Sequence, residues 1–128
     1  MKTETASIDI AASPDAVWAV VGDFGGLDSW MAGVDKCDVE GDVRTVHTMG
    51  MEIKETLVAK DDAARSITYS ITEGAPAESH EATITVADGT GGGSHVTWDV
   101  SVAPDEMAEL FVGIYQGALD ALKGHVEG

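Results

Sequence analysis

The chain has 128 residues, of which 44% are apolar, and this is enough for one domain with its own hydrophobic core. Its 23 acidic and 7 basic residues give a formal net charge of −16. This charge argues against nucleic acid and anionic membranes as partners, because both require clusters of Lys and Arg. Cys37 is the only cysteine, which excludes an internal disulfide framework. The predicted domain spans residues 1–128.

The first residues, MKTETASIDI, lack the apolar stretch of a secretory leader. No apolar run approaches the ~18 residues that a membrane span needs. We therefore expect a cytoplasmic protein without membrane insertion.

The chain opens with a predicted strand over residues 3–10, which places Ile8 and Ile10 on one face. Two short helical segments follow. Ser13-Pro14-Asp15 is typical of a helix start, and this helix is expected to end near Gly22. A second helical turn is predicted over 27–31.

Six further strands are predicted from period-2 alternation or β-rich composition, over residues 34–40, 43–49, 51–60, 65–73, 79–87 and 94–102. Pro104 then opens a predicted long helix with Asp105 and Glu106 in its first turn. Its apolar positions recur at a spacing of three or four residues and form one stripe, comprising Met107, Leu110, Phe111, Ile114, Ala118, Ala121 and Leu122. This order of elements favours an α+β fold, in which a meandering antiparallel sheet holds the long helix on its concave face.

The alternation also predicts which side chains face the helix. On three different strands it places Glu55, Tyr69 and His80 on the same, otherwise apolar, inner face. For the strand over 43–49 two assignments remain open, since either Arg44, Val46 and Thr48 or Val43, Thr45, His47 and Met49 point inward.

A carboxylate on an apolar face needs compensation, because burying an unpaired charge is costly. Glu55 either borders a wet cavity that binds a ligand, or pairs internally with Arg44, His80 or Tyr69. An apolar surrounding would raise its pKa toward neutrality, which would suit acid–base chemistry. The sequence shows no cofactor motif, and His47, His95 and His125 lack the spacing of metal ligands, so neither a cofactor nor a metal is expected.

Several segments resemble the SRPBCC/START-like superfamily, in its bacterial polyketide cyclase/dehydrase and lipid transport branch. They are SIDIAASPDAVWAVVGDFGGLDSWMAGVDKC, GDVRTV, KETLVAKDDAARSITYSI, EGAPAESHEATITV, SHVTWDVSVAP and the final helix. The layout is also similar to plant abscisic-acid receptors and birch-pollen-allergen proteins. The resemblance implies a helix-grip fold, in which a seven-stranded antiparallel sheet surrounds the C-terminal helix and leaves a cavity between them.

The resemblance also implies roles for particular positions. Glu55 matches a pocket glutamate of the plant receptors, and Tyr69 and His80 match aromatic pocket positions. Met31 stands where those receptors carry a lysine that pairs with a ligand carboxylate, so a ligand held by that ion pair is not expected. Residues 74–77 match a loop that often gates the cavity, whereas the turn over 49–51 is shorter than the second gate of the receptors.

The predicted ligand-binding residues combine these inferences. They are Trp30, Met31, Arg44, Ile53, Glu55, Tyr69, Ile71, His80, Ala82, Trp98, Met107, Phe111 and Tyr115. The favoured hypothesis is a module that binds a small hydrophobic molecule (a lipid, sterol, polyketide or aromatic compound), as a monomer or homodimer. The alternatives are a cyclase-, aromatase- or isomerase-like enzyme with Glu55, His80 or Tyr69 as its candidate catalytic groups, and an interaction module with a vestigial pocket.

Overall fold

A computed structural model describes residues 2–31, 33–48, 50–74 and 77–127. Its strands form one antiparallel sheet in the order β1-β7-β6-β5-β4-β3-β2. The strands are β1 (Lys2–Ile10), β2 (Val34–Glu40), β3 (Val43–Thr48), β4 (Met51–Asp61), β5 (Ser66–Glu73), β6 (Ser79–Asp88) and β7 (Ser94–Ala103). The predicted α+β helix-grip fold with a seven-stranded sheet is confirmed.

Two short helical segments connect β1 to β2, as predicted. The helix α1 (Pro14–Val21) begins at Ser13, whose hydroxyl accepts a hydrogen bond from the amide of Ala16, and ends at Gly22. A single 3₁₀ turn, η1 (Leu27–Ser29), follows, and it is shorter than the predicted segment over 27–31.

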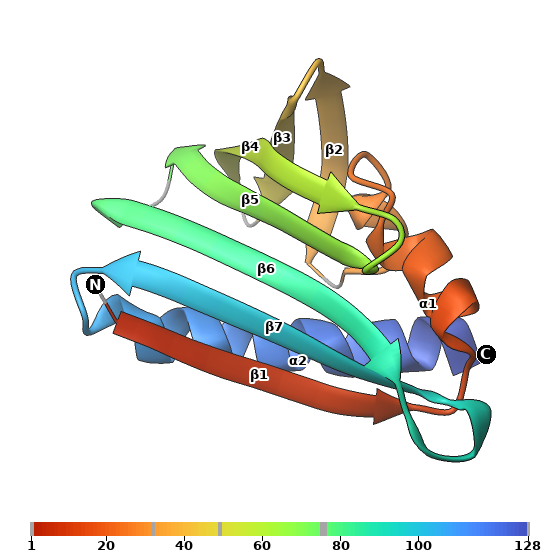
Figure 1. Ribbon diagram of the computed structural model, residues 1–128. Coiled ribbons are helices and arrows are strands. Elements are labelled where there is room, and N and C mark those ends of the chain that lie inside the picture. Colours follow the sequence, from red (N-terminus) through yellow and green to blue (C-terminus); the bar gives the residue numbers. More distant parts are fainter. Residues whose placement is uncertain (1, 32, 49, 75–76, 128) are drawn as a thin grey trace.

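The long helix α2 (Met107–Glu127) packs against β1 and β7 (Figure 1). The prediction that it opens at Pro104 is wrong. The amides of Met107 and Ala108 bond three residues back, to the carbonyls of Pro104 and Asp105, so a tight turn precedes the helix. Asp105 and Glu106 therefore lie before its first turn.

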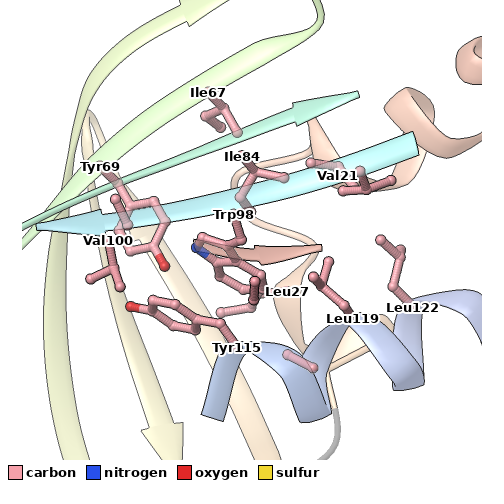
Figure 2. Close-up of a cluster of buried hydrophobic side chains, with 14 of the residues drawn as sticks. Val21, Leu27, Ile67, Tyr69, Ile84, Trp98, Val100, Tyr115, Leu119 and Leu122 are labelled. Atoms are coloured by element: carbon pink, nitrogen blue, oxygen red, sulfur yellow. The ribbon is translucent and has the colours of Figure 1, made fainter. Parts of the chain in front are cut away.

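The inner face of the sheet carries most of the core. Leu119 and Leu122 of α2 point toward Val21 and Ile84 in Figure 2, and both leucines are fully buried. Every second residue is buried along β7 and from His80 to Val86 in β6, as the alternation predicts. The open question about residues 43–49 is also resolved, because Arg44 and Val46 are buried and point inward. Met49 lies outside the described residues.

The stripe of α2 is only partly buried. Leu110 and Ile114, two members of the predicted stripe, are 52% and 42% exposed. The reason is geometric: α2 follows β1 and β7, at one side of the sheet, and β2–β4 lie at the other side (Figure 1). Irregular pairing in β4, at Lys54/Glu55 and Leu57/Ala59, interrupts the ladder there, and such bulges bend a strand.

Candidate functional site

A cavity of about 450 Å³ lies between the inner face of the sheet and α2. This volume is within the range of roughly 300–1,000 Å³ that is typical of small-molecule sites. Its walls come from β3, β4, β5, β7, α2 and the segment from η1 to β2. The wall is mainly aliphatic and aromatic, and its polar side chains are Arg44, Thr48, Glu55, Tyr69, Trp98 and Tyr115.

One polar part of the wall is a buried ion pair. Arg44 on β3 and Glu55 on β4 are direct partners in the antiparallel register, and Arg44 Nε donates to Glu55 Oε1 at 2.6 Å. Of the partners considered for Glu55, the structure thus selects Arg44. The carboxylate lies on the cavity wall and is also paired internally. That the cavity binds a ligand beside Glu55 stays a prediction.

The surroundings of this pair fix the guanidinium in place. Arg44 Nη1 donates to the carbonyl of Phe24 at 2.9 Å, and the guanidinium carbon lies 4.3 Å and 4.9 Å from the ring centres of Phe24 and Tyr69. Burial raises the pKa of the Glu55 carboxyl, although Arg44 opposes this effect. Among the described residues, no hydrogen bond to the second oxygen, Oε2, is found.

A second polar group joins β5, β6 and α2. His80 Nδ1 accepts the amide hydrogen of Ile71 at 3.1 Å, and its Nε2 lies 2.8 Å from the hydroxyl of Tyr115. Burial lowers the pKa of His80 to about 4, so the ring is neutral near pH 7. His80 is therefore not the partner of Glu55, because both of its nitrogens are engaged elsewhere.

The aromatic rings around this group are closely packed. Tyr115 stacks on Trp98 with 4.1 Å between ring centres and 4° between planes. Figure 2 shows the Tyr69 hydroxyl between the indole nitrogen of Trp98 and the Tyr115 hydroxyl. Within the described part of the chain, this nitrogen is the one fully buried side-chain nitrogen or oxygen without a hydrogen bond of good geometry.

Ten of the thirteen predicted ligand-binding residues lie on the cavity wall. They are Met31, Arg44, Ile53, Glu55, Tyr69, Ile71, Trp98, Met107, Phe111 and Tyr115. The alternation predicted the strand residues among them, because a side chain on the inner face of the sheet points either at α2 or into the cavity beside it. That they contact a ligand stays a prediction.

The other three, Trp30, His80 and Ala82, are not among the residues that line the cavity. Their contact with a ligand is untested as well. Trp30 is a core residue that packs on Trp98 with ring centres 6.2 Å apart. His80 packs between Phe111 and Tyr115, and the small side chain of Ala82 is covered completely. An inward-facing position is therefore not sufficient to place a residue on the cavity wall.

Sequence reasoning missed much of the cavity mouth. Met51, Leu110 and Ile114 line the cavity although each is more than 40% exposed, so they border its opening to solvent. The spacing of Met107, Leu110 and Ile114 on one side of α2 was the available signal. Gly74, the first residue of the expected gating loop, also lines the cavity. Ala75 and Pro76 lie outside the described residues.

No group of three His, Cys, Asp or Glu side chains suited to a metal ion occurs in the described part of the chain. A helix with the length and apolarity needed to cross a membrane is likewise not found among these residues.

Comparison with protein families shows a match over residues 1–127 to the model described as polyketide cyclase/dehydrase and lipid transport. A search of curated proteins found no significant relative.

Solved structures gave close matches. The protein XoxI from Bacillus cereus is 33% identical, with a TM-score of 0.93 over 99% of this chain and 96% of its own. An uncharacterised protein from Bacillus thuringiensis is 31% identical, with a TM-score of 0.91 over 99% of this chain and all of its own. A START superfamily protein from Mycobacterium smegmatis is 15% identical, with a TM-score of 0.83 over 98% and 97% of the two chains, and shares the fold.

Proposed function

Because the chain belongs to the polyketide cyclase/dehydrase and lipid transport family, we propose that it binds a small hydrophobic molecule in the cavity between the sheet and α2. The ligand classes we consider are a lipid, a sterol, a polyketide and an aromatic compound. The observation that carries the proposal is the cavity of about 450 Å³, with its apolar wall and few polar groups.

The form of the cavity mouth supports this proposal. Leu110 and Ile114 on α2 and Met51 at the start of β4 are exposed apolar side chains at the opening. Such side chains provide an apolar path from the surface to the interior. Methionines at Met31, Met51 and Met107 add flexible, polarisable contacts, which suit ligands of irregular shape.

Native mass spectrometry of the gently purified protein is the first test. We expect a discrete additional mass that disappears after denaturing extraction. If the protein is free of ligand, titration with the uncharged fluorescent probe N-phenyl-1-naphthylamine is the second test, and saturable binding is expected. Absence of both results would contradict the proposal.

A matched pair of variants locates the site. Ile53 lines the cavity, whereas Val58 on the same strand is 54% exposed and is not part of the wall. Ile53→Trp should fill the cavity and abolish probe binding, and Val58→Trp should leave it unchanged. Equal loss in both variants would indicate that the probe binds elsewhere or that the fold has changed, which thermal unfolding would reveal.

Proton transfer by Glu55 is a second candidate function. Two observations favour it: burial raises the pKa of this carboxyl, and its Oε2 has no partner among the described residues. The short contact with Arg44 opposes it, because the ion pair stabilises the charged form.

Exchange of the methyl protons of 2-acetylnaphthalene in D₂O, followed by NMR, separates the two functions. Faster exchange with the wild type than with Glu55→Gln would support the enzyme, while equal rates with retained binding would leave only the binding module.

A further inference from the structure

The hydrogen bonds of His80 determine which of its nitrogens carries the proton. The amide of Ile71 is always a donor, so Nδ1, which accepts from it at 3.1 Å, is unprotonated. The buried ring is neutral, so its single proton lies on Nε2. Nε2 therefore donates to the Tyr115 hydroxyl oxygen at 2.8 Å.

The same reasoning applies to Tyr115. Its oxygen accepts from His80, so its own proton must be directed elsewhere, and the neighbouring polar group is the Tyr69 hydroxyl (Figure 2). Burial raises the pKa of both tyrosines, so both hydroxyls keep their protons near pH 7 and can act as donors.

Tyr69 is then the last hydroxyl of the series. The indole N–H of Trp98 also faces its oxygen, without forming a hydrogen bond of good geometry. Among the described residues, no acceptor is found for the Tyr69 proton. Because Tyr69 forms part of the cavity wall, this proton is available to a molecule inside the cavity.

The charges of the cavity wall limit which molecules can accept a hydrogen bond from Tyr69. Arg44 is the one Lys or Arg in the described wall, and it is engaged by Glu55, by the carbonyl of Phe24 and by two aromatic rings. A carboxylate in the cavity would find no free cation and would be repelled by Glu55. A neutral oxygen meets neither difficulty.

We propose that the cavity selects an uncharged apolar molecule whose carbonyl or ether-type oxygen accepts a hydrogen bond from Tyr69, and that His80 is a positioning residue which makes this hydroxyl a donor. The proposal carries the proposed function further and depends on it. His80 does not touch the ligand; it acts through Tyr115.

Three probes of nearly equal shape test the selectivity. They are 2-acetylnaphthalene, which has a carbonyl, 2-ethylnaphthalene, which lacks it, and 2-naphthoate, which is anionic. We expect the acetyl compound to bind about tenfold more tightly than either of the others, as one hydrogen bond to a buried donor allows. Equal binding of the ethyl compound, or tighter binding of naphthoate, would overturn the inference and leave the proposed function standing. Failure of all three probes to bind, together with the absence of a co-purified ligand and of N-phenyl-1-naphthylamine binding, would overturn both.

Variants assign the selectivity to the hydroxyl series. Tyr69→Phe should bind the acetyl and the ethyl compound with about equal affinity, and its affinity for the ethyl compound should match that of the wild type. Tyr115→Phe and His80→Phe should reduce this preference by a smaller factor. Trp18→Phe is the control, because the Trp18 indole bonds to Asp62, outside the cavity, and its loss should leave the preference unchanged. An unchanged preference in Tyr69→Phe would contradict the assignment.

The tautomer of His80 provides a test that needs no ligand and no variant. The ¹⁵N shifts of the imidazole ring near pH 7 should show a protonated Nε2 and an unprotonated Nδ1. A proton on Nδ1 would refute the role of His80, whatever the probes show.

Discussion

Removing one member of the Arg44–Glu55 pair is expected to destabilise the protein far more than removing both. Their side chains are only 6% and 10% exposed, and the Nε–Oε1 distance is 2.6 Å. A charge left alone at that depth is only poorly solvated. Arg44→Met and Glu55→Leu should therefore each lower the free energy of unfolding by roughly 3–5 kcal/mol. The double variant carries neither charge, and should lie within about 1.5 kcal/mol of the wild type.

Urea unfolding followed by circular dichroism measures these differences. The pH dependence adds an independent check on Arg44→Met. Burial raises the pKa of Glu55, and without Arg44 the pKa should rise further. A carboxyl whose pKa is higher in the folded than in the unfolded state stabilises the fold at low pH and loses this contribution as the pH rises. The destabilisation should thus be larger at about pH 7.5 than at about pH 5.

Two results would refute this reasoning. If each single variant were as stable as the wild type, the pair would not be shielded from water. If the double variant lost as much as the two single variants together, the side chains would contribute through packing and not through their charges.

Three further predictions concern stability. Burial lowers the pKa of His80 from 6.5 to about 4, so between these pH values the unfolded chain binds a proton that the folded protein does not. As the pH falls from 6.5 to 4, the wild type should therefore lose about 3 kcal/mol of stability relative to His80→Phe. A stability difference that is independent of pH would argue against a neutral His80. Leu119→Ala, at a fully buried position of α2, should lower the free energy of unfolding by roughly 3–5 kcal/mol in the same urea assay, whereas a loss below about 1 kcal/mol would mean that the core collapses around the site. Ser13→Ala removes the side-chain cap of α1 and should lower the free energy of unfolding by about 1 kcal/mol, with Ser13→Asp restoring it.

The sequence by itself determined the elements and their faces. Alternation along a strand decides which side chains share a face, so Glu55, Tyr69 and the buried residues of β6 and β7 could be placed on the inner side without coordinates. The start of α1 could also be predicted, because the Ser13 hydroxyl accepts a hydrogen bond from the nearby amide of Ala16 and this contact depends on no distant residue.

Only the tertiary structure decided which of these residues meet. Arg44, His80 and Tyr69 were equal candidates as partners of Glu55, and the register of β3 on β4 selected Arg44. The position of α2 over β1 and β7 exposed Leu110 and Ile114 at the cavity mouth and brought Tyr115 to His80. Periodicity fixes the direction of a side chain within one element, whereas distances between elements depend on strand register, sheet curvature and helix position, which are set by packing over the whole chain.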